Sequence, residues 1–197
     1  MGDARMSLSF STSSLPEVPA PFQLRLLSMA DADGLIAVYS EEEVARSLNF
    51  EVPVRPETIR KKLAGDLEVM RRGESFRWVL STREDPTALG YLTIFNWSAR
   101  DRRAEVGYMV TRRLWGQGVM KLILPGLVRF GFEQMGLHRM EALVSVENPA
   151  SLRVLTRGGF QREGVLRGYR PAATGDAFVD MIILSMLKDE WLKVVAK

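Results

Sequence analysis

The sequence predicts an α/β (α+β) fold, in which a mixed sheet carries helices on both faces. Strand-like segments come in succession early in the chain and again at its end, whereas the middle alternates strand and helix. Successive strands joined by short turns pair antiparallel, and strands separated by a helix favour a crossover, so the order excludes a purely parallel sheet. The 197 residues, 46% of them hydrophobic, suffice for one such domain with a substantial core.

Composition excludes several classes of site. The chain has no cysteine, which removes disulfides, a thiolate nucleophile and cysteine metal ligands. Its single histidine, His138, cannot form a histidine-rich metal centre, so we expect no metal. A net charge of +3 allows an anionic ligand without requiring nucleic acid, and the chain has no apolar run long enough for a membrane helix. We therefore expect a cytoplasmic protein without nucleic-acid or membrane partners.

The first half of the chain supplies a tail, two helices and three strands. Residues 1–21 lack the apolar core of a signal peptide and are expected to be a flexible tail, with residues 22–197 forming a single domain. Pro56 suits the first turn of a helix and Gly73 its end. In order, we predict a strand at 22–28, a helix at 31–40, an unpatterned segment at 41–55, a helix at 56–72, and antiparallel strands at 76–81 and 89–97.

The second half contains the helix signals with the clearest chemistry. Asn148 and Pro149 are typical of an N-cap and a first helical residue, and Gly158-Gly159 ends that helix. Pro125 and Gly126 interrupt a helical pattern without an assignable role. In order, we predict a strand at 104–110, a helix to about 135, a strand at 139–146, a helix from 149, strands at 160–168 and 178–187, and a short helical tail.

A glycine-containing turn at residues 112–120 links the strand at 104–110 to the long helix. The first N–H groups of a helix have no intrahelical partners, and the helix dipole adds positive potential there, so such a turn can bind phosphate. Gly116 and Gly118 lack a Cβ and would let an anion approach the backbone. The same residues are also compatible with a turn that binds nothing.

Four motifs together resemble one family. They are Ala104-Glu105-Val106-Gly107-Tyr108, Trp115-Gly116-Gln117-Gly118, residues 137–142 (LHRMEA), and Asn148-Pro149-Ala150-Ser151 followed by Gly159-Phe160. Over residues 22–187 the chain resembles the GNAT acetyl-CoA-dependent N-acetyltransferases, most of all the RimJ/RimL branch. The resemblance implies a mixed, mostly antiparallel sheet that is splayed in the middle, between the strand of Glu105 and the strand after His138.

The resemblance also implies a donor site for acetyl-CoA, the expected co-substrate. The pantetheine arm would lie against the strand near its end, and the pyrophosphate would lie on the N–H groups of the turn. Gly107 would permit a bulge that opens the sheet, or would simply allow close packing. The implied acyl-CoA-binding residues are Met109, Val110, Arg113, Trp115, Gly116, Gln117, Gly118, Val119, Met120, Asn148 and Ser151.

For the chemistry, the family pattern implies direct attack of a primary amine on the thioester in a ternary complex. An amine must be neutral to attack, and Glu105 is the candidate base that would accept its proton. The alternative for Glu105 is a structural ion pair with Arg100, Arg102 or Arg103. The tyrosine that many members carry seven residues after the asparagine is Leu155 here, whereas Ser151 matches the serine of RimL-like enzymes. Ser151 is thus a candidate acid or thiol-binding group, or only a first-turn helix residue.

The acceptor side is the least patterned. RimL-like enzymes carry an acidic residue ten positions after the Gly-Phe phenylalanine, where this chain has Arg170, which weakens a ribosomal-protein substrate. We expect a primary amine, either a protein N-terminus or a small molecule, and a monomer or homodimer. The alternatives are a non-catalytic acyl-CoA-binding or sensing module and, more weakly, a nucleic-acid binder. The candidate substrate-binding residues are Asn49, Phe50, Trp97, Tyr169 and Arg170.

Overall fold

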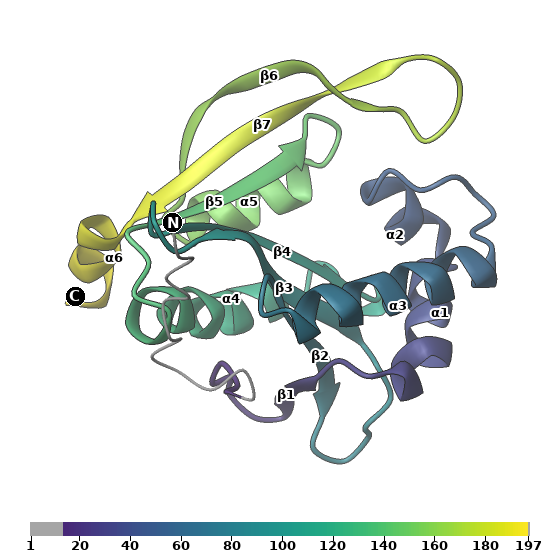
Figure 1. Cartoon of the computed structure of the whole chain (residues 1–197), viewed down its shortest axis with the longest axis horizontal. Coiled ribbons are helices and arrows are strands. Elements are labelled where there is room, and N and C mark those ends of the chain that lie inside the picture. The colour runs from purple at the N-terminus through teal and green to yellow at the C-terminus, as the bar shows by residue number, and fades with distance from the viewer. Residues whose placement is uncertain (1–13, 197) are drawn as a thin grey trace, which may run out of the picture.

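The computed structural model describes residues 14–196, which form a seven-stranded sheet in the order β1-β2-β3-β4-β5-β7-β6 (Figure 1). Every neighbouring pair is antiparallel except β4 and β5, which confirms the predicted mixed, mostly antiparallel sheet. The strands are β1 (Phe22–Leu26), β2 (Phe76–Thr82), β3 (Gly90–Ser98), β4 (Arg103–Val110), β5 (Arg139–Ser145), β6 (Gln161–Pro171) and β7 (Phe178–Leu187).

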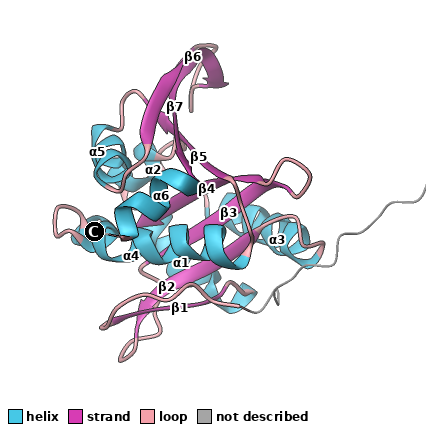
Figure 2. Cartoon of the chain, turned by 90° about the vertical axis from the view of Figure 1, so that its left-hand side faces the viewer, coloured by secondary structure: helices cyan, strands magenta, loops and turns pink. Residues whose placement is uncertain are grey.

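Helices cover both faces of the sheet, as predicted (Figure 2). Two clusters of buried side chains divide them. The α1-side cluster joins α1, α2 and α3 to Val79 and Met109, and the α4-side cluster joins α4, α5 and α6 to the opposite face. The helices are α1 (Ala32–Tyr39), α2 (Glu42–Ser47), α3 (Pro56–Arg71), α4 (Val119–Arg129), α5 (Pro149–Arg157) and α6 (Lys188–Val195), with short 3₁₀ turns η1 (Met29–Asp31) and η2 (Arg112–Leu114) and a π-helical turn η3 (Phe130–Gln134). None of the described helices is long and apolar enough to cross a membrane.

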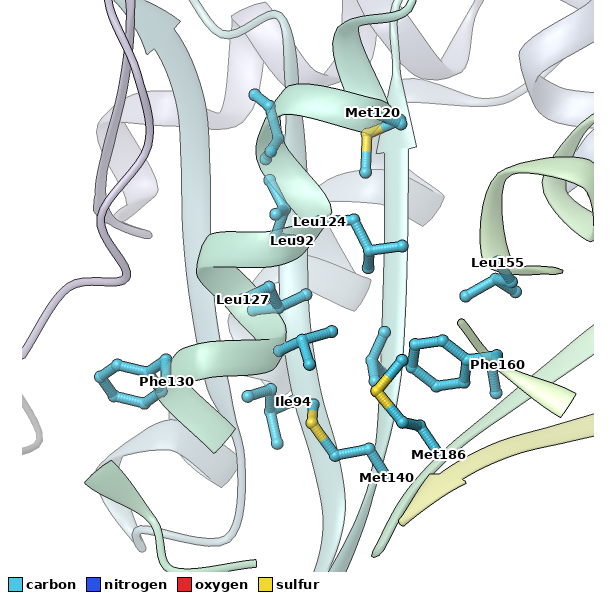
Figure 3. Packing of buried hydrophobic residues seen from close by; sticks show 14 of the residues in the cluster. Leu92, Ile94, Met120, Leu124, Leu127, Phe130, Met140, Leu155, Phe160 and Met186 are labelled. Carbon is cyan, nitrogen blue, oxygen red and sulfur yellow. The ribbon is translucent and has the colours of Figure 1, made fainter. Parts of the chain in front are cut away.

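The α4-side cluster is the larger hydrophobic core. Met120, Leu124 and Leu127 of α4 pack over Leu92 and Ile94 of β3 (Figure 3). Beside α4, to its right in Figure 3, the cluster is completed by Met140, Leu155, Phe160 and Met186, all of which are almost fully buried. This core holds the start of α4 and the start of α5 on the same face of the sheet.

The sheet opens between β4 and β5. These strands pair in parallel only at their beginnings, where Arg103, Ala104 and Glu105 are in register with residues 139–141. Beyond Glu105, β4 remains paired with β3 alone, and β5 remains paired with β7 alone. The expected splay is therefore present, and it exposes facing backbone edges of the two strands.

The irregularity that accompanies the splay lies in β3, not at Gly107. The register of β3 against β4 shifts between Phe95 and Ser98, where Asn96 has a φ of 50°. Gly107 pairs regularly with Thr93, and a Cβ on Gly107 would lie 3.1 Å from the Thr93 methyl group and 3.3 Å from the Phe95 ring. The expected bulge at Gly107 is thus wrong, and close packing explains the glycine.

The structure differs from the predicted elements in two other places, one short helix and one strand end. The unpatterned segment 41–55 contains the helix α2, whose Glu42 and Arg46 form an i,i+4 ion pair of 2.6 Å. Six residues are too few for a helical period to show in the sequence. The strand β6 extends to Pro171 rather than ending at 168, and with β7 it forms the long hairpin at the top of Figure 1.

The segment before β1 runs across the domain. The Trp78 indole Nε1 donates to the Ser14 carbonyl at 3.1 Å, and Val18 packs against the α4-side cluster. A Cβ on Gly126 would lie 1.9 Å from the Glu17 carbonyl oxygen, so this glycine lets residues 14–18 cross α4. Residues 1–13 of the expected tail lie outside the described residues, and the division into a tail and one domain stays a prediction.

Candidate active site

A cleft of about 320 Å³ lies where β4 and β5 diverge. Residues from both strands line it, together with side chains from β3, from the start of α5, from the end of α2 and from the β6–β7 hairpin. Of the predicted site residues it contains Glu105, Asn148, Ser151, Asn49, Phe50 and Arg170. Residues separated by more than a hundred positions therefore meet at one site.

Glu105 is held in the cleft by an amide. Its Oε1 accepts a hydrogen bond of 2.6 Å from Nδ2 of Asn96, the bulged residue of β3. Within residues 14–196 it forms no ion pair, and the nearby Arg103 instead pairs with Glu141 at 3.3 Å. The alternative of a structural Glu–Arg pair therefore finds no support in this part of the chain. A half-buried carboxylate without an ion-pair partner among the described residues therefore lines the cleft.

Tyr108 is a cleft residue to which the sequence analysis assigns no role. Its hydroxyl lies 2.9 Å from the Ser151 hydroxyl, so it joins β4 to the first turn of α5 across the mouth of the splay. Burial raises the pKa of Tyr108 to about 12, against a smaller lowering by the hydrogen bond to Ser151. Leu155, where a family tyrosine was expected, lines the cleft as a buried apolar side chain. In the sequence, Tyr108 is the last residue of the Ala104–Tyr108 motif, but that position alone does not predict a role for its hydroxyl.

Asn148 forms the expected N-cap. Its Oδ1 accepts from the Ser151 backbone N–H at 3.0 Å, which satisfies one free donor of α5. The side-chain amide of Asn148 keeps its own donors, and Asn148 lines the cleft. The cap thus fixes Ser151 opposite Tyr108 and leaves polar groups facing the open edge of β4.

The glycine turn before α4 has the geometry of an anion site. Gly116 and Gly118 have φ values of 75° and 74°, and a Cβ on either would meet no atom within 4 Å. Among the described residues, the N–H groups of Gly116, Gln117 and Gly118 have no hydrogen-bond acceptor. Val119 and Met120 follow as the first residues of α4, whose N–H groups have no intrahelical partners.

The flanking side chains stabilise this turn. The Trp115 N–H donates to the Arg112 carbonyl at 3.0 Å, so it is already bonded within the turn. The Trp115 indole donates to the Val110 carbonyl at 2.9 Å, and the Gln117 amide donates to the Arg113 carbonyl at 2.6 Å. Glu41, which the sequence argument did not single out, accepts from the Thr111 hydroxyl and from the Arg112 N–H. The end of β4 is therefore tied to the segment between α1 and α2.

Met109 and Val110 precede the turn at the end of β4. Both side chains are buried, in the α1-side and α4-side clusters respectively. Their backbones pair with Tyr91 and Gly90 of β3 on one side only. In the described structure the other edge of β4 has no strand beside it after Glu105, so an extended ligand could form strand-like hydrogen bonds there.

Two of the predicted substrate-binding residues lie elsewhere. Trp97 does not line the cleft, and its ring packs edge-on against Phe76, 6.0 Å between centroids. Side chains alternate along a strand, and the bulge at Asn96 reverses the alternation, so Phe95 faces the cleft and Trp97 does not. Tyr169 is 50% exposed and also lies outside the cleft lining.

A polar network forms the wall toward α1 and α3. Lys62 Nζ and Arg77 Nη2 both pair with Asp66, at 2.5 and 3.1 Å. The hydroxyls of Tyr39 and Tyr91 lie 3.0 Å apart, and burial raises the pKa of Tyr39. None of these side chains was predicted as a site residue, because their pairing depends on contacts between β2, β3 and α3. No group of residues suited to hold a metal ion occurs within the described part of the chain.

The chain is similar to known acetyltransferases over most of its length. The acetyltransferase (GNAT) domain family matches residues 22–161. The uncharacterized N-acetyltransferase YoaA of Bacillus subtilis is 31% identical over 146 residues, which cover 74% of this chain and 82% of that protein. The ribosomal-protein-serine acetyltransferase of Escherichia coli is 26% identical over 145 residues, covering 73% and 79% of the two chains. Among solved structures, RimL in complex with coenzyme A superposes with a TM-score of 0.77 at 19% identity, covering 90% of this chain and 99% of that one.

Proposed function

This chain belongs to the GNAT acetyltransferase family, and we propose that it transfers the acetyl group of acetyl-CoA to a primary amine by direct attack in a ternary complex. The observation that best supports this proposal is the cleft between β4 and β5. In it, Glu105 and the Tyr108–Ser151 pair lie on either side of the open edge of β4. The proposed site combines a donor-binding edge, a base and a hydrogen-bonding pair for the leaving group.

Acetyl-CoA would bind along the open edge of β4 and the glycine turn before α4. The pantetheine arm, which has amide groups, would pair with the open edge of β4 near Met109 and Val110. The pyrophosphate would accept from the N–H groups of Gly116 to Met120, with Arg113 nearby in the same turn. The side-chain amide of Asn148 would donate to the arm from the opposite side. This arrangement leads the thioester toward Glu105, where β4 and β5 begin to separate.

Glu105 would act as the base. An α-amine has a pKa of about 8 and a lysine amine about 10.4, so most of either is charged at neutral pH. Glu105 lies on β4 next to the position that we propose for the thioester, and it has no cationic partner among the described residues. It would attract the ammonium form and accept the proton as the amine attacks, directly or through one water molecule.

The Tyr108–Ser151 pair would assist the departing thiolate as a hydrogen-bond donor. A thiol has a pKa of about 8.5, whereas that of Tyr108 is raised to about 12. Complete transfer of the tyrosine proton to the thiolate is therefore uphill by roughly three to four pKa units, or about 4–5 kcal/mol. Hydrogen bonding to the sulfur carries no such cost and still stabilises the charge that develops there.

The test is thiol release from acetyl-CoA in the presence of an amine panel of protein N-terminal peptides, polyamines and amino acids. Amine-dependent release together with an N-acetylated product supports the proposal. The alternative of a non-catalytic acyl-CoA sensor predicts a thermal shift with acetyl-CoA but no thiol release with any amine. No thermal shift with any acyl-CoA would contradict both functions, because a ligand at 100 times its Kd stabilises a protein by about 2.7 kcal/mol.

A further inference from the structure

Charged side chains of both signs line the cleft. Its three cationic residues are Lys62, Arg77 and Arg170. Lys62 and Arg77 share Asp66, so that group keeps one net positive charge, whereas the Arg170 guanidinium has neither an ion-pair nor a hydrogen-bond partner among residues 14–196. Glu105 is the acidic residue that lines the cleft, and its bond is to a neutral amide. Among the described residues, Arg170 on β6 is therefore the cleft cation without an acidic partner, and Glu105 at the splay is the cleft anion without a cationic partner.

Arg170 is fixed beside the cleft by its neighbour. The Asn49 side chain donates to the Pro171 carbonyl at 2.7 Å, which ties the segment after α2 to the end of β6. Asn49 has a φ of 61°, a conformation that asparagine tolerates better than most residues. The β6–β7 hairpin accordingly reaches across above α2 (Figure 1). The backbone next to Arg170 is thus anchored beside the cleft that Arg170 and Glu105 both line.

Apolar side chains form part of the cleft lining between these charges. Phe50 after α2, Phe95 on β3, and Val179 and Met181 on β7 line the cleft. A volume of about 320 Å³ is that of a small-molecule site, at the lower end of the usual range of about 300–1,000 Å³. Separated charges of opposite sign with apolar walls are complementary to a small zwitterion that bears an apolar side chain.

We infer that the acceptor is a free α-amino acid with an apolar side chain, bound with its amine toward Glu105 and its carboxylate on Arg170. This assignment rests on the proposed acetyl transfer and names its substrate class. In the step, the amine nitrogen forms a bond to the acetyl carbonyl carbon and the carbon–sulfur bond breaks. Glu105 takes one proton of the bound ammonium group, which gives the neutral amine that attacks. The second proton leaves the nitrogen as the amide forms and passes through water to the CoA sulfur, which departs with the electron pair and ends as the thiol. A peptide N-terminus has an amide in place of the carboxylate and gives Arg170 no anion to bind.

Matched acceptors test the charge requirement. Thiol release is measured for leucine, methionine and phenylalanine, for the amide of each, for the corresponding decarboxylated amines, and for short peptides. Rates are compared per neutral amine, because conversion to the amide lowers the amine pKa and decarboxylation raises it. We expect kcat/KM to be roughly 10- to 100-fold higher for each amino acid than for its amide, the range for one hydrogen bond between charged groups.

Charge reversal at Arg170 assigns the effect to this residue. Arg170→Glu is expected to reverse the order of acid and amide, and Arg170→Lys to keep it at reduced strength. Arg167→Glu is the matched control, since Arg167 is an exposed arginine of the same strand that does not line the cleft. Equal use of acids and amides, an unchanged order in Arg170→Glu, or preference for peptides would overturn the inference while leaving acetyl transfer intact. Absence of thiol release with every amine would instead refute the proposed function.

Discussion

At the scale of single residues, β4 sends its reactive groups to opposite faces of the sheet. Ala104, Val106 and Tyr108 contact the α4-side cluster, while Met109 belongs to the α1-side cluster. Alternation places Glu105 on the Met109 face, so the proposed base and the proposed thiolate donor stand on the two sides of one strand.

Replacing Glu105 isolates the base. Glu105→Gln preserves the size of the side chain and an acceptor for Asn96, so the fold and the acetyl-CoA affinity are expected to remain. Turnover should fall by roughly 10²- to 10⁴-fold at neutral pH, the usual contribution of a general base, and should recover partly at higher pH as the amine deprotonates by itself. Initial rates from pH 6 to 10, with acetyl-CoA Kd as a control, measure this. Unchanged turnover at neutral pH would remove Glu105 from the mechanism.

Replacing Tyr108 tests the thiolate donor. Tyr108→Phe removes only the hydroxyl, so Ser151 loses a partner at 2.9 Å while the ring packing is retained. We expect kcat to fall roughly 10- to 100-fold, as for loss of one hydrogen bond to a charged group, with little change in the KM for the amine. Because the pKa of Tyr108 is about 12, this variant should show no change in the pH profile below pH 10. A shifted profile in that range would contradict a purely hydrogen-bonding role.

These residues also show what a sequence can and cannot specify. The N-cap role of Asn148 follows from local chain geometry and was predictable from the Asn-Pro pair. Trp97 lies outside the cleft because the bulge at Asn96 reverses the facing of every later side chain of β3. No local sequence feature predicts such a bulge. The contact of Tyr108 with Ser151 joins positions 43 residues apart, and it depends on how α5 docks on the sheet.

At the scale of elements, the turn between β4 and α4 is the clearest case in which local sequence predicted structure. Its two glycines were expected to expose backbone donors, and both adopt the left-handed region with open space at the Cβ position. By contrast, α2 gave no periodic signal, although its last turn and the following residues Leu48, Asn49 and Phe50 line the cleft. Short elements that are held by tertiary contacts are therefore the ones a pattern misses.

Gly116→Ala tests the turn against a matched glycine. A Cβ at Gly116 strains the backbone at φ 75° by about 1–2 kcal/mol and would project into the space proposed for the pyrophosphate. Gly175→Ala imposes the same kind of strain at φ 74° in the turn between β6 and β7, away from the phosphate site. Both variants should lose similar stability in denaturant unfolding, and only Gly116→Ala should raise the acetyl-CoA Kd. Equal Kd values would place the phosphates elsewhere.

At the scale of the whole molecule, splaying leaves the C-terminal part of the sheet dependent on its own contacts. The strands β5, β7 and β6 join β4 only through three registered pairs. A polar cluster crosses all three: Arg139 of β5 binds Glu163 of β6 and the Ser185 hydroxyl of β7, and Ser185 donates to Glu163 at 2.7 Å. Arg139 also pairs with Glu141 at 2.6 Å. These bonds hold the hairpin that carries Arg170.

This cluster makes stability depend on acid pH with a definite sign. The hydrogen bond from Arg139, followed by that from Ser185, lowers the pKa of Glu163 to about 2 from an ordinary value near 4.5. A carboxyl whose folded pKa is depressed adds stability that is complete above its unfolded pKa, and this stability is lost as the pH falls from about 4.5 toward 2. Glu163 is 41% exposed, so solvent screening keeps the contribution modest. Denaturant unfolding at several pH values should show the wild type losing more stability than Glu163→Gln between pH 5 and 3. Parallel curves for the two proteins would show that Glu163 is not a source of the acid sensitivity and that the hairpin is held by its apolar contacts alone.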